Sequence, residues 1–164
     1  AIGMAALARP LDGTILRQME YLYGLSGGSL SAEDKKKLDD LKGDIARIKS
    51  LTGADKGSTA KILGAMPAYW LDLRGYDPPE LAKSVRKPML FLQGGRDYQV
   101  QTADLELWKA ALSDRKDVEF KLYPKLNHLF TAGEGVLTPL EYSQEHGSVL
   151  EDVMTDIAAW IGKR

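Results

Sequence analysis

The stretch that decides the fold reads Pro-Met-Leu-Phe-Leu-Gln-Gly-Gly-Arg-Asp at residues 88–97. Its first six residues form a run of strand length that is apolar up to Gln93, and the two glycines end the run. A run that is apolar on both faces predicts a central parallel strand that is covered by helices on each side. The stretch therefore predicts an α/β protein with this strand in its core.

The sequence that follows predicts a helix, a second strand and a last helix. Thr102 is expected to cap the first helix, and residues 118–123 alternate between apolar and polar side chains, as a half-exposed strand does. Residues 148–151, Ser-Val-Leu-Glu, form a capping box before the last helix. This order predicts two parallel strands with a right-handed crossover and flanking helices. The last helix is expected to bury Val149, Val153, Ile157 and Trp160.

Upstream of residue 88, the sequence predicts a short strand and then a helical insertion. Residues 2–7 are apolar, and Pro10 stops them. Residues 14–66 are read as wholly helical, with a long helix that Ser31 caps and a short helix at 58–66. Helices inserted between two core strands predict a cap. The expected organisation is a core strand at 1–13, a helical cap insertion at 14–66 and a C-terminal α/β core at 67–164.

The composition limits the classes of function. The 164 residues are 44% hydrophobic, which is enough for a core, and the net charge of −1 offers no strong field to nucleic acid or to an anionic membrane. No apolar run reaches the roughly 18 residues that a membrane span needs. The absence of cysteine excludes disulfides, thiolate metal sites and cysteine nucleophiles, and two histidines argue against a His-rich metal site. Nucleic acid, membrane and metal are therefore not expected as partners, and the compartment stays open.

Two chemically capable side chains follow the two predicted parallel strands. Asp97 lies four residues past Gln93, and His128 lies five residues past Tyr123. Ligands of open α/β sheets bind beyond the carboxyl ends of the strands, so a carboxylate and an imidazole are expected to meet there. An aspartate that accepts from one imidazole nitrogen orients the ring and leaves the other nitrogen free to act as a general base.

Each of these residues also has an alternative interpretation. An aspartate after a Gly-Gly turn can serve the turn alone, and a histidine in a loop is often a surface or packing residue. Their positions at matching strand ends favour the catalytic interpretation for Asp97 and His128. His146 is the weaker candidate, because it stands in a polar stretch before a helix, where exposure to solvent explains it.

Two segments resemble a known family. Residues 87–97, which end in Gly-Gly-Arg-Asp, look like the acid-bearing segment of α/β-hydrolases. Residues 123–130, Tyr-Pro-Lys-Leu-Asn-His-Leu-Phe, look like the segment that contains the family's histidine. The separation of 31 residues between Asp97 and His128 is typical of that family. A narrower resemblance is carried by residues 9–11, 69–73 and 75–78. These segments look like those of bacterial dienelactone-hydrolase-like or acyl-peptidase-like esterases with a helical cap.

The resemblance implies the back half of an α/β-hydrolase fold, with residues 2–7, 88–93 and 118–123 as its sixth, seventh and eighth strands. The N-terminal half of the sheet would be missing, and the nucleophilic serine would lie upstream of the first residue. The implied activity is that of a serine hydrolase that cleaves carboxylic esters through an acyl-enzyme, with Asp97 as acid, His128 as base and no cofactor. The alternatives are a peptidase or amidase of the same fold, and an inert fragment that associates with its missing half, with itself or with a partner.

Residues 24–28, Gly-Leu-Ser-Gly-Gly, match the Gly-x-Ser-x-Gly pattern of a nucleophile elbow. An elbow needs an apolar strand before the serine and a helix that starts at it. Helical spacing precedes Ser26 instead, and the next helix has its own cap at Ser31. Glycines at this density are typical of a helix–helix connection. Ser26 is therefore rejected as the nucleophile, and the sequence predicts none within the chain.

Aromatic side chains near the acid segment are candidates for a substrate pocket. Residues 67–73 are aromatic, lack helical spacing and include Tyr69 and Trp70, while Tyr98 follows Asp97 directly. The alternative for Tyr69 and Trp70 is packing between cap and core. A small-molecule ester is the expected substrate.

Overall fold

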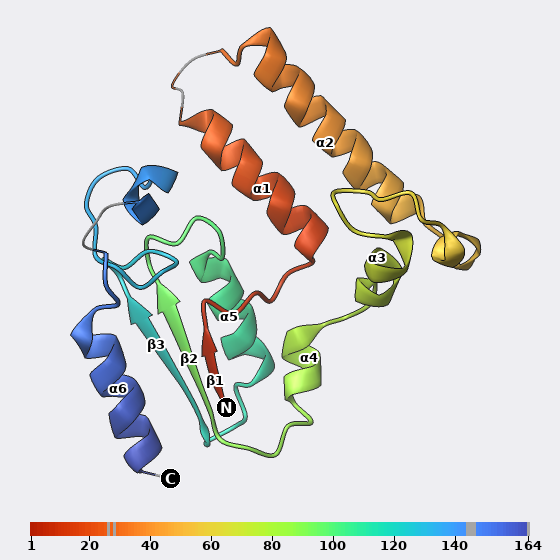
Figure 1. Ribbon diagram of the computed structural model, residues 1–164. Helices are drawn as coiled ribbons and strands as arrows, with labels where there is room; N and C mark the ends of the chain where they lie inside the picture. The colour runs from red at the N-terminus through yellow and green to blue at the C-terminus, as the bar shows by residue number, and fades with distance from the viewer. Residues whose placement is uncertain (26, 28, 144–146, 164) are drawn as a thin grey trace. The chain divides into compact units, whose positions relative to one another are not determined.

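A computed structural model describes most of the chain (Figure 1). The chain divides into a sheet unit, Ala1–Ala8 with Pro78–Arg164, and a helical unit, Arg9–Asp77. The helical unit includes the predicted insertion at 14–66, whose role as a cap stays a prediction. No helix in the described part of the chain is long and apolar enough to cross a membrane. The described residues are 1–25, 27, 29–143 and 147–163.

Within the described residues, the sheet unit is built on three parallel strands, β1 (Ile2–Met4), β2 (Met89–Gly94) and β3 (Val118–Tyr123). They lie in the order β1-β2-β3, so β2 is the central strand and pairs with a neighbour on each side. Every residue of β2 is buried, as the apolar run predicts. The α/β class and the parallel pairing of β2 with β3 are thereby confirmed.

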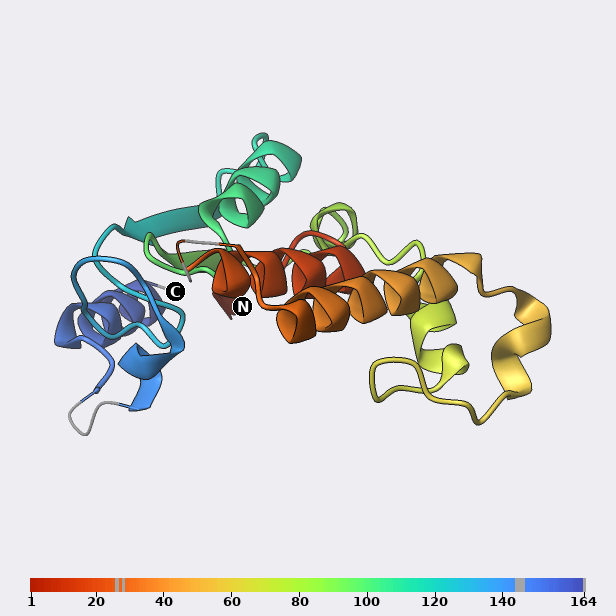
Figure 2. The same ribbon diagram turned by 90° about the horizontal axis from the view of Figure 1, so that it is seen from above.

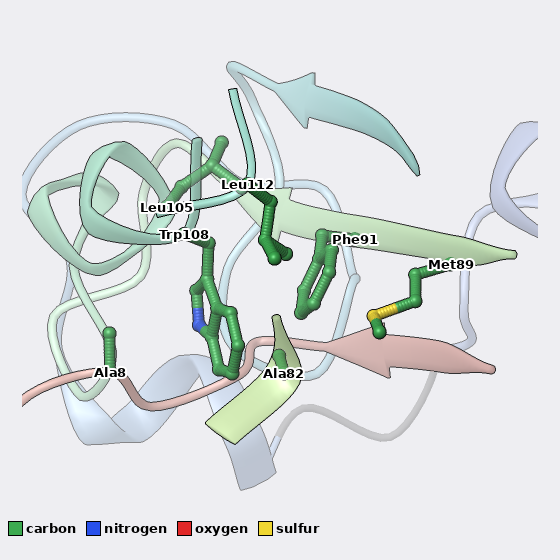
Figure 3. Close-up of a cluster of buried hydrophobic side chains, with 7 residues drawn as sticks. All are labelled: Ala8, Ala82, Met89, Phe91, Leu105, Trp108 and Leu112. Atoms are coloured by element: carbon green, nitrogen blue, oxygen red, sulfur yellow. The ribbon is translucent and has the colours of Figure 1, made fainter. Parts of the chain in front are cut away.

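One face of β2 packs on α4 (Pro78–Ala82) and α5 (Thr102–Ala111). Phe91 points to this face, and its ring stacks on the ring of Trp108 with 4.5 Å between the centroids. Trp108 donates its Nε1 hydrogen to the backbone oxygen of Ala6, 2.9 Å away, so the polar atom of the indole is satisfied. The buried side chains of this cluster, drawn in Figure 3, are Ala8, Ala82, Met89, Phe91, Leu105, Trp108 and Leu112.

The opposite face of β2 packs on α6 (Glu151–Gly162), and Figures 1 and 2 show α5 and α6 on the two sides of the sheet. Leu90 and Leu92 point to this face, where Val153 and Trp160 of α6 are buried. Successive side chains of a strand point to opposite faces, and both faces of β2 are apolar because a helix covers each. The last helix and the burial of Val153 and Trp160 agree with the prediction.

The helical unit begins with two antiparallel helices, α1 (Leu11–Gly24) and α2 (Ala32–Ser50), which lie side by side in Figures 1 and 2. The Ser31 hydroxyl accepts from the backbone N–H of Asp34 at 3.0 Å and donates to the Asp34 carboxylate at 2.7 Å. The side chain thus satisfies one of the N–H groups that the first turn of a helix leaves without a partner. The predicted cap of α2 is confirmed.

Arg74 holds the other end of α2. Its guanidinium donates to the backbone oxygens of Leu51, Ile48 and Lys49 at 2.6, 2.8 and 3.2 Å. The last carbonyl groups of a helix have no partner inside the helix, and they form its negative end. A cation bound to them stabilises both the helix end and the chain that follows it.

The segment after α2 differs from the prediction. Residues 58–66 form no α-helix: a short 3-10 helix, η1 (Gly53–Gly57), comes before them, and an antiparallel bridge closes a turn at 62–65. The stretch that lacks helical spacing forms α3 (Pro67–Leu73) instead. The proline at its first position needs no hydrogen-bond partner there, and the burial of Trp70 anchors this short helix.

Three boundaries also differ from the prediction. β1 is shorter, because Ala5 has a φ of 45° and leaves the extended conformation. The N-cap of α5 is Gln101, one residue earlier than expected. The N-cap of α6 is Leu150, without a side-chain hydrogen bond, and Val149 is 38% exposed. The predicted capping box at 148–151 and the burial of Val149 were therefore wrong.

Candidate active site

Asp97 lies in the loop that follows β2, and its side chain is fully buried. One carboxylate oxygen, Oδ1, accepts from the backbone N–H groups of Gln99 and Val100 at 2.8 and 2.9 Å. The other, Oδ2, accepts from the side-chain amide of Gln93 at 3.3 Å and lies 2.8 Å from Nδ1 of His128. Four partners in the described chain therefore fix the orientation of a carboxylate that water does not reach.

His128 lies in the loop that follows β3, and the structure brings it to Asp97, the juxtaposition that the strand ends predict. Because the carboxylate accepts, the Nδ1 of the ring is the nitrogen that bears hydrogen and donates. The histidine side chain is 28% exposed, so one edge of the ring is open. In the part of the chain that the structure describes, no hydrogen-bond partner occupies Nε2, which can therefore accept a proton.

Two glycines allow the loops of Asp97 and His128 to meet. A Cβ on Gly94 would lie 2.5 Å from the backbone oxygens of Leu126 and Asn127, and a Cβ on Gly95 would lie 2.7 Å from the Cα of Pro124. Side chains do not tolerate such distances from backbone atoms, so any other residue would push the loops apart. The backbone N–H groups of Gly95 and of the next residue donate into the histidine loop at 2.8 and 2.9 Å.

The hydrogen bond to Asp97 raises the pKa of His128 above its ordinary value. Partial burial of the ring acts in the opposite direction, and the negative charge of the carboxylate adds to the rise. The ring is therefore a stronger base than a free histidine. A base of this strength suits the removal of a proton from a hydroxyl group, provided that the ring is neutral when the transfer begins.

Asn127 closes the turn that presents His128. Its side chain is fully buried, and Oδ1 accepts from the backbone N–H groups of Leu129 and Thr131 at 3.0 and 3.2 Å. Phe130, in the same turn, has a φ of 58°, which is rare for a bulky residue. Its buried ring and the hydrogen bonds of the turn hold this conformation in place.

An ion pair connects the loop of Asp97 with a third segment of the chain. Arg96 donates to both carboxylate oxygens of Glu141, and each side chain is 13% exposed. Glu141 belongs to the short 3-10 helix η2 (Pro139–Ser143). Its Oε2 also accepts from Nδ2 of Asn127 at 3.3 Å. The hydrogen bond from Arg96 is the main reason why the pKa of Glu141 lies below its ordinary value, so the carboxyl is ionised at neutral pH.

Sequence reasoning missed Gln93, Arg96, Asn127 and Glu141 as parts of the site. Glu141 stands 45 residues after Arg96 in a loop without a periodic pattern, so no spacing connects the two. Asn127 offered a signal, because it directly precedes His128, and an asparagine beside a turn often bonds to the backbone. Gln93 offered another, as a polar residue at the end of a buried strand.

The three pocket candidates lie in both units. Tyr98, which follows Asp97, is half-buried and stacks on Tyr142 with 6.1 Å between centroids. Trp70 is 5% exposed and donates its Nε1 hydrogen to the backbone oxygen of Ile62 at 2.9 Å, while Tyr69 is 47% exposed. The burial of Trp70 is explained by packing within the helical unit. A pocket role for these residues stays a prediction.

Ser26 and His146 lie outside the described residues. The elements on either side of Ser26 are the helices α1 and α2, and α2 has its own cap at Ser31. The helical surroundings on which Ser26 was rejected as a nucleophile are therefore present. The rejection itself stays a prediction.

The chain is similar to esterase EstD of Thermotoga maritima. The two are 38% identical over 160 residues, which cover 98% of this chain and 36% of EstD. The chain thus spans about a third of the length of this curated relative. A homologue named as an esterase therefore matches nearly the whole chain. No protein-family model matches the chain, and no solved structure matches it.

Proposed function

We propose that this chain supplies the acid, Asp97, and the base, His128, of a serine esterase with an α/β-hydrolase fold. The observation that carries the proposal is the 2.8 Å hydrogen bond between Nδ1 of the histidine and the fully buried carboxylate. A solvent-accessible ring that a buried carboxylate orients is the arrangement that general-base catalysis needs. The similarity to esterase EstD supports carboxylic esters as the substrates.

The proposed reaction has two halves. In the first, a serine hydroxyl attacks the acyl carbon while Nε2 of His128 takes the hydroxyl proton, and Asp97 stabilises the imidazolium that forms. The ring gives this proton to the oxygen of the departing alcohol, which leaves an acyl-enzyme. In the second half, Nε2 takes a proton from water, the water oxygen adds to the acyl carbon, and the serine oxygen regains a proton as the acid departs. Proton transfer by one ring serves both halves, so the reaction needs no cofactor.

In this proposal, the nucleophilic serine belongs to the full-length protein upstream of these 164 residues. The alignment with 36% of EstD supports a nucleophile outside these 164 residues, because the relative has segments beyond the matched part. The edge of β1 supports it as well. Among the described residues β1 pairs with β2 alone, and Ile2 and Met4 are 37% and 41% exposed. Further strands of the same sheet would cover such an edge. In the same proposal, the helical unit serves as the cap that shapes substrate access.

The test compares the full-length gene product with the 164-residue chain. Hydrolysis of p-nitrophenyl acetate and butyrate is measured for both, and a fluorophosphonate probe reports a reactive serine. We expect the full-length protein to hydrolyse the esters and to be labelled, and the chain by itself to do neither. A full-length protein that fails in both assays contradicts the esterase proposal. Activity of the chain by itself contradicts the upstream nucleophile and restores Ser26 as a candidate. Parallel assays with p-nitroanilide substrates separate an esterase from an amidase or peptidase.

A further inference from the structure

We propose that Arg96, Glu141 and Asn127 form a positioning network that holds His128 against Asp97, an inference that rests on the proposed role of this pair. None of the three is expected to touch the substrate. Their contribution would be to fix the place and the direction of the imidazole ring. A ring displaced by about 1 Å can cost a reaction up to about 100-fold in rate, so such a network has a measurable effect.

The hydrogen bonds form a continuous path between the two loops of the site. Arg96 stands directly before Asp97, and its guanidinium binds both oxygens of the Glu141 carboxylate. That carboxylate accepts from Nδ2 of Asn127, whose Oδ1 accepts from two backbone N–H groups of the turn around His128. The loop of Asp97 and the turn of His128 are therefore connected through this side-chain network as well as through the hydrogen bond between Asp97 and His128.

The network is shielded from water and closely packed. The side chains of Arg96 and Glu141 are each 13% exposed, and Asn127 is fully buried. A Cβ on Gly133 would lie 2.0 Å from Nη1 of Arg96 and 2.6 Å from Oε2 of Glu141, so the backbone of this residue lies directly against the ion pair. The guanidinium also donates to the backbone oxygens of residues 134 and 135 at 3.1 and 3.2 Å. Removal of Glu141 would leave a shielded positive charge and an amide without their acceptor, which forces the loops to rearrange.

A second ion pair of the same chemistry provides a matched control. Arg115 binds both carboxylate oxygens of Asp117 at 3.0 and 2.7 Å and also donates to three backbone oxygens. Asp117 immediately precedes β3, so this pair lies at the amino end of the strand, whereas His128 follows the carboxyl end. Loss of either pair should destabilise the sheet unit, but only the loss of Glu141 should disturb the histidine.

The experiment measures the pKa of His128 in the full-length protein by NMR titration with 13C-labelled histidine, with the signal assigned by its loss in His128→Gln. In the parent protein we expect a pKa above 6.5, because Asp97 faces the ring. In Glu141→Ala this pKa should fall toward 6.5, because the hydrogen bond between His128 and Asp97 weakens. In Glu141→Gln the pKa should fall less, because the amide oxygen of the glutamine still accepts from Asn127. In Asp117→Ala the pKa should stay at the parent value even though the melting temperature falls.

The outcomes are distinguishable from those of the esterase test. An unchanged His128 pKa in both Glu141 variants, with the same loss of melting temperature as in Asp117→Ala, overturns the positioning network and leaves a structural role. If Glu141→Ala does not fold, Glu141→Gln gives the same decision with a smaller shift. If the full-length protein hydrolyses esters, kcat should fall on the order of tenfold in Glu141→Ala while KM changes little. The titration needs no turnover, so it decides on the network even if the esterase proposal fails.

Discussion

At the scale of single residues, the aspartate is held more firmly than the histidine. Asp97 has three donors besides His128, and two of them are backbone N–H groups of its own loop. The carboxylate therefore keeps its place whether the ring is protonated or neutral. The ring has the carboxylate as its hydrogen-bond partner within the described residues, so its orientation and its pKa both depend on Asp97.

The substitution Asp97→Asn tests this dependence. An amide cannot stabilise the imidazolium by charge, and its NH2 group would favour the wrong tautomer of His128. We expect the pKa of the histidine to fall, and kcat for ester hydrolysis in the full-length protein to decrease by on the order of 1,000- to 10,000-fold. The control is Asp156→Asn, whose carboxylate accepts from Lys121 and Tyr123 elsewhere in the sheet unit. A histidine pKa that is the same in Asp97→Asn and in the parent protein would contradict the pairing.

The raised pKa of His128 also predicts opposite effects of pH on stability and activity. The folded state binds the proton more tightly than the unfolded state, so this stabilisation is fully present below about pH 6.5 and is lost as the pH rises through the folded pKa. The base must be neutral to act, so activity should rise over the same interval. Urea unfolding and ester hydrolysis measured at several pH values check both trends, and His128→Gln should remove the pH dependence of stability in this interval. Activity that falls across the interval would contradict the assignment of the base.

At the scale of elements, the glycine turn after β2 determines whether the two loops can meet. In Gly94→Ala, a Cβ would contact two backbone oxygens of the histidine loop at 2.5 Å. We expect the free energy of unfolding to fall by about 1–3 kcal/mol, the usual cost of overpacking, and ester hydrolysis to be lost with it. Gly43→Ala in α2 is the matched control, because nothing lies within 4 Å of its Cβ and alanine favours a helix interior. Unfolding measured in urea should show Gly43→Ala to be stabilising. Equal stability of the two variants would contradict the close approach of the loops.

The C-terminal end of α2 gives a prediction for the helical unit. Arg74→Met removes a guanidinium that donates to three backbone oxygens, so we expect the unfolding free energy to fall by about 1–2 kcal/mol. Arg74→Lys keeps the charge near the negative end of the helix and should lose less. Thermal unfolding followed by circular dichroism distinguishes the two. A methionine variant as stable as the lysine variant would show that the charge and the hydrogen bonds contribute little.

Elements with strong local signals could be predicted from the sequence. The apolar run of β2, the alternation of β3 and the Ser31 cap of α2 each record a local requirement of burial or hydrogen bonding. Segments whose conformation depends on distant contacts were predicted wrongly. Residues 67–73 lack helical spacing, yet they form α3, in which Trp70 is buried against the apolar cluster of the helical unit. The capping box at 148–151 was wrong because the N–H of Leu150 bonds to the backbone oxygen of Phe130, a partner outside the segment.

The candidate site also contains residues that local patterns predict and contacts that depend on distant segments. Asp97 and His128 could be placed near each other from strand ends alone, because parallel strands end at one rim. The contacts that fix these two side chains could not be predicted from the sequence. Arg96 and Glu141 are 45 residues apart, and the close packing around Gly94 depends on the path of the histidine loop.

At the scale of the whole molecule, each unit has a core of its own. The sheet unit buries apolar clusters on both faces of β2, and the helical unit buries a separate cluster that includes Ile48, Ile62 and Trp70. The acid and the base both belong to the sheet unit. The chain spans about a third of EstD. In the proposed esterase, residues from outside these 164 would complete the site.

The most direct test of the Asp97–His128 pair is the hydrolysis of p-nitrophenyl butyrate by the full-length protein and its His128→Gln variant. We expect kcat to fall by on the order of 1,000-fold or more while the variant stays folded, because the base is lost but the fold remains. His146→Gln, which changes the other histidine of the sequence, should keep the parent rate. A His128→Gln variant that stays within tenfold of the parent kcat would contradict the assignment of His128 as the base.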